Sequence, residues 1–463
     1  MTPWKSLVGV WPTFSQAVLM IVTVLTVSGC ATRTWNQPIG TLDPADAYDF
    51  QTRLPDNAED IFVVLAFSGG GVRSAAFAYG VLEKFRDTRV VIDGKQRRLL
   101  DEVDVITSVS GGSFTAAYYG LFGDRIFSDF KPDFLLRDTQ VELYKLFANP
   151  LNLARLASGE YNRSDLAAQW YDQALFESRK FSDLSLGNLP FVIINASDLN
   201  NGVTFSFIQQ QFDFLCSSMS DYPVANAVMA SANVPAAFAT IGLRNYQDCP
   251  QRHIAWVDEA LDKDSPLDRR FGVARAMSRY QNPASMPYVR LVDGGVTDNL
   301  GVRGSMMSPV AQYGNVSDMA GAFTTQQLAK VRRVLVIVAN AQVYSEYKWS
   351  QRGKEPNAIS ATRAAFDASL GILNTETASL AKQGFQMWAQ RINATRGADA
   401  APVDVHFSVL TFDHITNEVE RSYFQSLPTS LRLDPQAVEA VSRLGGRLLD
   451  ESPEFIEFLK ALQ

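Results

Sequence analysis

Four short, largely apolar runs recur along the chain, and a glycine-containing turn directly follows three of them. They are rich in β-branched residues and too short for typical helices, which indicates strands buried on both faces of a parallel sheet. The runs are Ile61–Phe67, Val103–Val109, Tyr288–Val292 and Val334–Asn340. Two further runs, Phe191–Asn195 and Val203–Phe207, flank an Asn-Asn-Gly turn that ends at Gly202, so they predict a β-hairpin.

Segments with helical spacing of apolar residues lie between and after these runs. Residues 74–85 and 124–190 carry such patterns, the second as an insertion between core strands. A longer apolar stripe from residue 359 to residue 392 favours a packing face over a lid or a membrane-binding surface. The tail from Asp434 predicts two short helices separated at Gly445-Gly446. Together the elements predict an α/β fold with three α/β/α layers, a mostly parallel central sheet and helical additions.

The second apolar run ends at a serine. Ser110 is followed by Gly111 and Gly112, and then by a small-residue, aromatic-rich segment of helical character. A strand that turns sharply into a helix at a serine holds the hydroxyl clear of the backbone, above the edge of the sheet. Because a serine hydroxyl alone is a poor nucleophile, a catalytic role for Ser110 requires a base and an oxyanion site elsewhere in the chain.

The glycines after the first run are the candidate oxyanion site. Gly69, Gly70 and Gly71 allow the backbone to turn so that several N–H groups converge at the positive end of a helix dipole. Such a nest suits an oxyanion or a phosphate. No Gly-Lys-Ser/Thr follows, and Ser74 stands where a dinucleotide fingerprint has its last glycine, so the pattern disfavours a nucleotide site.

Asp293 is the candidate base. It follows the third run and precedes Gly294 and Gly295. Functional side chains gather at the carboxyl ends of strands in a parallel α/β sheet, and both Ser110 and Asp293 are expected there. Taken alone, the tripeptide favours an ordinary Asp-Gly turn whose side chain caps its own loop. The catalytic interpretation therefore depends on all three motifs together.

The three motifs, in this order, resemble those of the patatin-like phospholipase family, which are Gly-x-Gly-x-x-Gly, Gly-x-Ser-x-Gly and Asp-Gly-Gly or Asp-Gly-Ala. The resemblance implies a serine acyl hydrolase that cleaves lipid esters through an acyl-serine, with a Ser-Asp dyad, no histidine and no metal or cofactor. It assigns Ser110 as the nucleophile, Asp293 as the proton acceptor, and the amides of Gly69, Gly70 and Gly71 as the oxyanion loop.

Two positions depart from the family pattern. Ser108 occupies the position of the first glycine in the family's Gly-x-Ser-x-Gly motif, the sharp turn called the nucleophile elbow. Ser74 occupies the position of the last glycine in the oxyanion motif. Serine is only slightly larger than glycine, so the turn should survive, but a displaced elbow lowers the rate. A catalytically weak or silent lipid-binding envelope protein is therefore the competing interpretation. Supporting roles are assigned to Arg73, Gly112, Gly294 and Gly295. Arg73 would orient the loop or a phosphate head group, or form a structural ion pair.

Histidine-dependent catalysis is a second alternative. The chain has three histidines, and a triad in the order Ser, Asp, His is compatible with the positions of two of them. His414, at a predicted strand end, is the stronger rival, while His406 lies within an alternating, strand-like run.

The composition is that of a globular protein. Of 463 residues, 46% are hydrophobic and 20% are charged. The net charge of −7 predicts no electrostatic attraction to nucleic acid or to an anionic bilayer. We therefore expect a lipid ester as the binding partner and no nucleic acid. The insertion at residues 124–190 is well placed to shape an acyl pocket. The oligomeric state is not predicted.

The N-terminus resembles a bacterial lipoprotein signal. Lys5 precedes the apolar run Ala17–Val27, which is short for a membrane span and is followed by Ser28-Gly29-Cys30. The resemblance implies removal of residues 1–29, a lipid on Cys30 and a place in the bacterial cell envelope, anchored at the outer membrane and facing the periplasm. A transmembrane stub or an ordinary secretory signal is the alternative.

The processed chain divides into three parts. We expect a polar tether over residues 30–58, a patatin-like catalytic domain over 59–345, and a mostly helical extension over 346–463 that packs on that domain. Processing would leave Cys216 and Cys249 as the remaining thiols, and an oxidising periplasm favours a disulfide between them.

Overall fold

The computed structural model describes most of the chain beyond Asp60. The described residues are 34–40, 47–49, 53, 57–58, 60–92, 94–184, 186–235, 237–247, 249, 254–305, 310, 330–344, 347–351, 353, 355–396 and 401–462. The predicted signal peptide, the predicted lipidation site Cys30, most of the predicted tether and His253 lie outside them. Within the described ranges, no helix has both the length and the apolar character needed to span a membrane.

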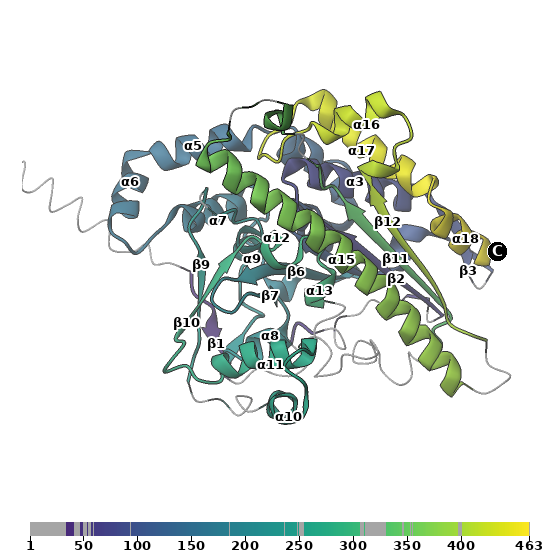
Figure 1. Cartoon of the computed structure of the whole chain (residues 1–463), viewed down its shortest axis with the longest axis horizontal. Helices are drawn as coiled ribbons and strands as arrows, with labels where there is room; N and C mark the ends of the chain where they lie inside the picture. Colours follow the sequence, from purple (N-terminus) through teal and green to yellow (C-terminus); the bar gives the residue numbers. More distant parts are fainter. Residues whose placement is uncertain are drawn as a thin grey trace, which may run out of the picture.

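A mixed eight-stranded sheet forms the centre of the molecule (Figure 1). Its order is β12-β11-β2-β5-β6-β10-β9, with β7 paired to β6. The strands are β2 Ile61–Phe67, β5 Val103–Val109, β6 Phe191–Asp198, β7 Val203–Ser206, β9 Ile241–Arg244, β10 Tyr288–Val292, β11 Arg333–Asn340 and β12 Asp404–Thr411. The first five strands in this order pair in parallel, whereas β7, β10 and β9 pair antiparallel. The predicted apolar strands and the predicted hairpin are confirmed.

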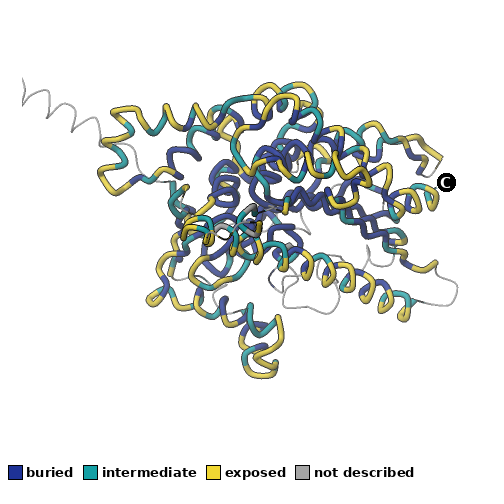
Figure 2. Tube along the Cα trace, turned by 45° about the horizontal axis from the view of Figure 1, so that its top comes forward, coloured by how far each residue is buried: buried dark blue, intermediate teal, exposed yellow. Residues whose placement is uncertain are grey.

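Helices cover both faces of the sheet, which gives the predicted three-layer α/β/α architecture. On one face α3 contacts α4 and α17, and on the other α15 contacts α12 and α13. Figure 1 shows α15 crossing in front of the strands. The helices of the two faces are α3 Val72–Asp87, α4 Gly111–Phe122, α9 Val224–Ser231, α17 Pro435–Asp450, α18 Pro453–Ala461, α12 Gly295–Asp298, α13 Val302–Ser305 and α15 Ala358–Thr395. Because both faces are covered, every residue of β2 and β5 is buried (Figure 2).

The remaining elements decorate this core. The predicted helical insertion contains three α-helices, of which α5 and α6 meet at a sharp bend at Asn149 and project from the molecule (Figure 1). This bent helix pair, residues 138–157, is called the α5–α6 hairpin below. These helices and the others outside the two layers are α5 Thr139–Ala148, α6 Pro150–Ala157, α7 Arg163–Ala174, α8 Gln209–Asp213, α10 Ala255–Lys263, α11 Arg269–Tyr280 and α16 Glu418–Gln425. Two small ribbons pair β1 Gln37–Pro38 with β8 Ser217–Ser218, and β3 Arg89–Ile92 with β4 Lys95–Arg98.

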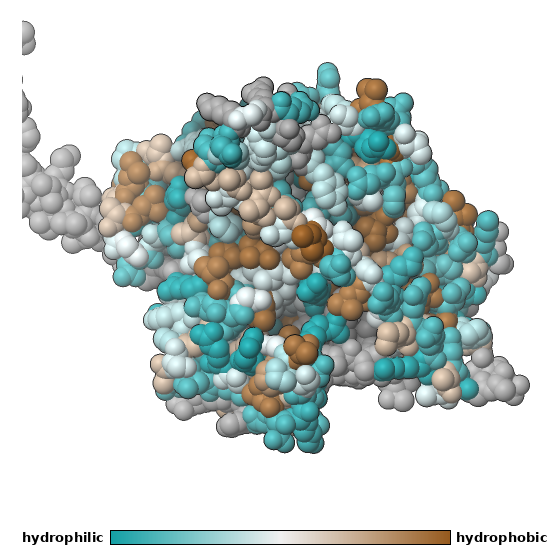
Figure 3. Space-filling model, in the orientation of Figure 1, coloured by the Kyte–Doolittle hydropathy of each residue, from teal (hydrophilic) through white to brown (hydrophobic). Residues whose placement is uncertain are grey.

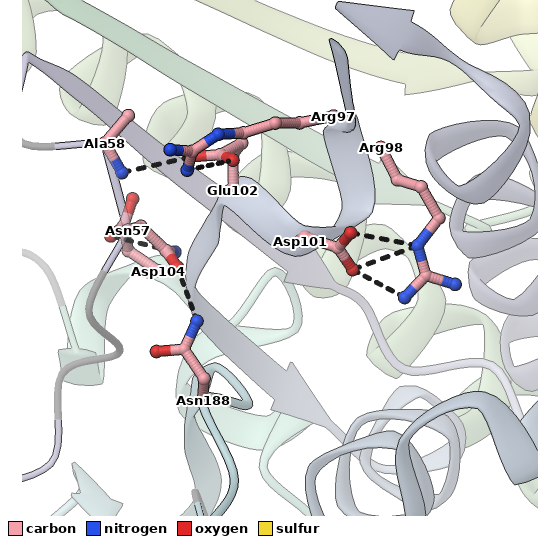
Figure 4. A network of polar contacts seen from close by, with 8 residues as sticks. All are labelled: Asn57, Ala58, Arg97, Arg98, Asp101, Glu102, Asp104 and Asn188. Carbon is pink, nitrogen blue, oxygen red and sulfur yellow. Dashed lines mark hydrogen bonds and ion pairs between the residues drawn. The ribbon is translucent and has the colours of Figure 1, made fainter. Parts of the chain in front are cut away.

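A polar network closes the amino end of β5, opposite the end that carries Ser110 (Figure 4). The buried Asp104 accepts a hydrogen bond from the backbone N–H of Val63 at 2.7 Å, where the pairing of β2 with β5 shifts register. Glu102 accepts from the N–H of Ala58 at 3.0 Å and pairs with Arg97 at 3.1 Å. Burial raises the pKa of Asp104 well above its usual value. The network therefore fixes the chain before β2 to the sheet.

The C-terminal region is part of the sheet as well as of the helical layers. β12 pairs with β11 along its whole length. α15 fulfils the predicted packing face only in its second half, where Phe385 and Trp388 are buried, whereas Ile359 and Phe366 in its first half are exposed.

The predicted break at Gly445-Gly446 is wrong, because α17 runs through both glycines. A Cβ at Gly445 would lie 2.5 Å from the carbonyl oxygen of Phe77, and one at Gly80 would lie 1.8 Å from that of Ser442. These glycines therefore allow α17 to approach α3 closely, and the helix ends only before Ser452.

The structure joins Cys216 to Cys249 by a disulfide, with their Cα atoms 5.6 Å apart. That separation is usual for disulfides, for which it is about 4.4–6.8 Å.

Candidate active site

Ser110 occupies the sharp turn between β5 and α4. Its φ of 51° and ψ of −120° place it in a region that residues with a side chain rarely adopt. Two hydroxyl contacts hold the turn: the N–H of Ser110 donates to Ser231 Oγ at 2.8 Å, and Ser231 donates to the carbonyl oxygen of Asn195 at 2.6 Å. Ser231, the last residue of α9, thus supports the strained elbow from outside the motif.

The structure brings Ser110 and Asp293 together. Ser110 Oγ donates a hydrogen bond to Asp293 Oδ2 at 2.8 Å, and both residues are buried. The other carboxylate oxygen accepts from the N–H of Gly295 at 2.8 Å. The backbone N–H of Asp293 donates to the carbonyl oxygen of Asn233 at 2.9 Å. The end of α9 and the residues just after it therefore orient both members of the pair.

Asp293 reaches the elbow by a route that differs from the predicted one. The expectation of a parallel strand before Asp293 is wrong, because β10 pairs antiparallel with β6. β6 extends past β5, since Asn195 is already level with Val109, and β10 pairs only with Ser197 and Asp198 at the end of β6. β10 therefore approaches from beyond the carboxyl end of β5 and ends beside Ser110.

The environment of Asp293 tunes its basicity. Burial raises the pKa of Asp293 to about 6, against the opposing effect of the hydrogen bonds from Gly295 and Ser110. A carboxylate with a pKa near neutrality is a stronger proton acceptor than an exposed one and remains mostly ionised at pH 7. The pair can therefore deprotonate the serine hydroxyl without a third group.

The glycine loop faces the elbow, although not every predicted donor is available. Gly69 donates its N–H to the carbonyl oxygen of Asn299 at 3.0 Å, so this amide is engaged and the prediction of three donors from the loop must be corrected. The N–H groups of Gly70, Gly71 and Gly111 donate to no acceptor among the described residues. A Cβ at Gly111 would lie 2.0 Å from the carbonyl oxygen of Gly71, so the two backbones meet where a side chain would not fit.

The other predicted glycines serve close packing. A Cβ at Gly112 would lie 2.7 Å from the carbonyl oxygen of Phe67, and one at Gly294 would lie 2.4 Å from that of Asn195. The two serines that replace family glycines are buried and satisfied: Ser108 donates to the carbonyl oxygen of Ile193 at 3.1 Å, and Ser74 donates to that of Ser68. Both departures are thus accommodated without displacing the turn.

Arg73 attaches a C-terminal segment to the glycine loop. Its buried guanidinium donates to the carbonyl oxygens of Ala341 and Leu427 at 2.9 and 2.6 Å, and to Thr429 Oγ1 at 3.0 Å. Beside it, the N–H of Val72 donates to the carbonyl oxygen of Ser430 at 3.0 Å. Burial lowers the pKa of Arg73 to about 10, so the group stays charged at neutral pH. Of the roles considered for Arg73, orientation of the loop fits these contacts.

We expect Arg73→Leu to lower the free energy of unfolding by about 3 kcal/mol, because it leaves buried acceptors without donors. Urea denaturation measures this change. Arg275→Leu is the matched control, since Arg275 is exposed on α11, and it should change stability little. Unchanged stability of Arg73→Leu, together with a raised KM for phosphate-bearing lipids alone, would instead place Arg73 at a head group.

An apolar cavity of about 450 Å³ opens over Ser110. Its walls come from the insertion, the segment after α9 and the C-terminal segment held by Arg73. The lining side chains include Phe114, Phe134, Leu143, Phe147, Tyr171, Phe238 and Leu431. Among the described lining residues, Arg163 is the one cation. Cavities of this size and character accommodate small apolar ligands or parts of larger ones.

The two described histidines lie at the edge of the sheet formed by β12, away from Ser110. His406 belongs to β12 and His414 follows it, and β11 and β2 separate β12 from β5. His414 is exposed, whereas His406 is buried and its ring contacts that of Phe458. Within the described ranges, no group of three or more His, Cys, Asp or Glu residues is arranged to hold a metal ion.

The chain is similar to a known protein family and to several solved structures. A family model described as Patatin-like phospholipase matches residues 65–305. Human GIVD cytosolic phospholipase A2 is 13% identical, with a TM-score of 0.43 over 87% of this chain and 63% of that chain. Its complex with methyl gamma-linolenyl fluorophosphonate and terbium chloride is 15% identical, with a TM-score of 0.40 over 87% and 60%. VipD from Legionella pneumophila is 11% identical, with a TM-score of 0.27 over 92% and 73%. The chain thus spans less than two thirds of the length of the human enzyme. No curated protein sequence matches.

Proposed function

Because the chain belongs to the patatin-like phospholipase family, whose model matches more than half of its 463 residues, we propose that it hydrolyses lipid esters with a Ser110–Asp293 dyad. The observation that carries this proposal is the 2.8 Å hydrogen bond from Ser110 Oγ to Asp293 Oδ2. A silent lipid-binding protein would need neither a serine held at positive φ nor a carboxylate buried against its hydroxyl, and both features cost stability.

The geometry of the site supports a two-step mechanism through an acyl-serine. Asp293 takes the hydroxyl proton of Ser110 as Oγ attacks the ester carbonyl carbon, and the oxygen that becomes negative faces the amides of Gly70, Gly71 and Gly111. Collapse breaks the ester C–O bond, the leaving alcohol takes the proton from Asp293, and the acyl group stays on Ser110. Water, deprotonated by Asp293, then attacks the acyl-serine, and the proton returns to Ser110 as the fatty acid leaves.

The cavity favours a phosphate-bearing lipid as the substrate. Its aromatic and aliphatic walls suit an acyl chain, and Arg163 supplies a positive charge for a phosphate. We therefore place the activity in the phospholipase A and lysophospholipase class, ahead of neutral glyceride hydrolysis.

Release of free fatty acid from phosphatidylcholine, lysophosphatidylcholine and monoacylglycerol tests the function, with Ser110→Ala as the blank. We expect release from the phospholipids, and a KM for them that rises in Arg163→Gln while the KM for monoacylglycerol does not. Release no greater than the blank from every lipid would end the hydrolase proposal.

The pH dependence of kcat/KM should report the ionisation of Asp293. Only the carboxylate accepts the serine proton, and its pKa is about 6, so the rate should reach a plateau above about pH 7. Below the pKa it should fall about tenfold for each pH unit, as the protonated fraction grows. Initial rates with a soluble ester between pH 4.5 and 8 measure this profile. A rate constant that does not change over this range would contradict Asp293 as the base.

We also propose that the protein is anchored in the bacterial envelope by a lipid on Cys30. The N-terminal pattern carries this proposal, and the Cys216–Cys249 disulfide supports an oxidising compartment. Metabolic labelling with palmitate checks it: wild type should incorporate the label and Cys30→Ala should not.

A further inference from the structure

Apolar side chains are exposed at the wall of the cavity and on the helices that adjoin this wall. They come from α5, from α6 and from the segment after α9, and Figure 3 shows hydrophobic surface over the projecting α5–α6 hairpin. The exposed residues are Val141, Tyr144, Leu151, Leu153 and Val234. We call these five residues the apolar rim.

The hairpin tip is not a packing face of the described fold. α6 has no buried residue, and Leu151 and Leu153 are 70% and 53% exposed. Figures 1 and 2 show α6 at the periphery, away from the buried core. Contiguous exposed apolar surface of this kind marks an interaction site in a soluble domain.

The apolar rim is continuous with the cavity. Tyr144 and Val234 belong to both, since each lines the cavity wall and each is exposed, Tyr144 by 62%. These two side chains therefore connect the exposed rim to the cavity that opens over Ser110.

The charges of the hairpin identify the kind of surface. Residues 138–157 contain two acidic residues, Asp138 and Glu142, and two basic residues, Lys145 and Arg155, so the hairpin is neutral. The whole chain carries a net charge of −7. Attraction to an anionic membrane is thus not available, and binding must come from burial of apolar side chains.

We propose that the apolar rim docks onto the surface of a zwitterionic phospholipid bilayer, with the first turn of α6, which carries Leu151 and Leu153, inserted end-on below the head groups and the cavity mouth facing the lipid. Docking in this orientation delivers a lipid ester to the cavity, and in this respect the inference rests on the proposed function. Because the attraction is apolar, added salt and added anionic lipid should not strengthen it.

Co-sedimentation with phosphatidylcholine vesicles tests the proposal. All proteins begin at Ala31, the residue after the predicted lipidation site, so that neither an N-terminal lipid nor the apolar run Ala17–Val27 contributes. The Leu151→Glu/Leu153→Glu variant should bind about a hundredfold more weakly than its parent, since each leucine loses its apolar burial. Leu267→Glu/Val91→Glu is the control: these residues are 95% and 55% exposed, lie outside the hairpin and give the same change of charge. It should bind like the parent.

Hydrolysis of a soluble short-chain ester separates this proposal from the proposed function. The hairpin variant should hydrolyse that ester normally and lose activity only on vesicles. If no protein hydrolyses any ester but binding follows the expected pattern, docking stands and the hydrolase proposal fails. Docking is overturned if the parent does not bind vesicles or if the hairpin variant binds equally well. It is also overturned if the parent is a dimer that the hairpin substitutions dissociate, because the rim would then face a second copy.

Discussion

Ser110→Ala should lower kcat/KM for ester hydrolysis by about 10⁴-fold or more, because removal of a catalytic nucleophile leaves only binding and oxyanion stabilisation. The same change should abolish covalent labelling by a fluorophosphonate probe, which reacts with an activated serine. The fold should survive, since Ser110 is held by its backbone N–H as well as by its hydroxyl. Circular dichroism and labelling on the same sample measure both effects.

Ser442→Ala is the matched control for this experiment. Ser442 is also buried, but it lies on α17 and its hydroxyl donates only to the carbonyl oxygen of Val438, at 2.9 Å. Its replacement should leave labelling intact. Persistent labelling of Ser110→Ala would identify a different nucleophile and remove the basis of the mechanism.

Asp293→Asn should lower the rate of ester hydrolysis by about 10²–10⁴-fold, the usual contribution of a positioned general base. Asparagine keeps the size of the side chain and can still accept the hydrogen bond of Ser110, but its amide does not take up the proton. Its rate should also lose the dependence on an ionisation near pH 6. Combining it with Ser110→Ala should add little further loss, because the two residues act as a unit.

His414→Ala is the counterpart of Asp293→Asn and should leave the rate unchanged. His414 is exposed beyond β12, separated from β5 by two strands. The opposite pair of results, in which His414→Ala is inactive and Asp293→Asn is active, would favour a histidine-dependent triad over the dyad.

Much of this architecture could be predicted because local patterns determine it. Apolar runs predicted the positions of β2, β5, β10 and β11, and glycines follow the first three of them. The motif order predicted the meeting of Ser110 with Asp293 across 183 positions. The direction of β10 could not be predicted, since a strand five residues long has the same composition whichever way it runs. The same limit applies to Gly445, because a glycine that ends a helix and one that lets two helices touch look identical in sequence.

The supporting residues of the site escaped prediction for a different reason. Ser231 and Asn233 hold the elbow and the carboxylate through contacts that span more than fifty positions, and serine and asparagine are common in every segment. The one local signal in this segment is the run of mostly small residues that forms α9 and ends at Ser231. The engaged amide of Gly69 depended on Asn299, whose position becomes defined only when the chain is folded.

The attachment of residues 427–430 to the glycine loop sets a lower limit on the length of an active chain. The family model ends at residue 305, yet Arg73 and Val72 bind Leu427, Thr429 and Ser430. A fragment trimmed to the matched region would lack the segment that contacts the glycine loop, as well as strands β11 and β12 of the sheet. Gene fusions and truncations of this protein should therefore preserve the chain at least through α17, however complete the three motifs look without it.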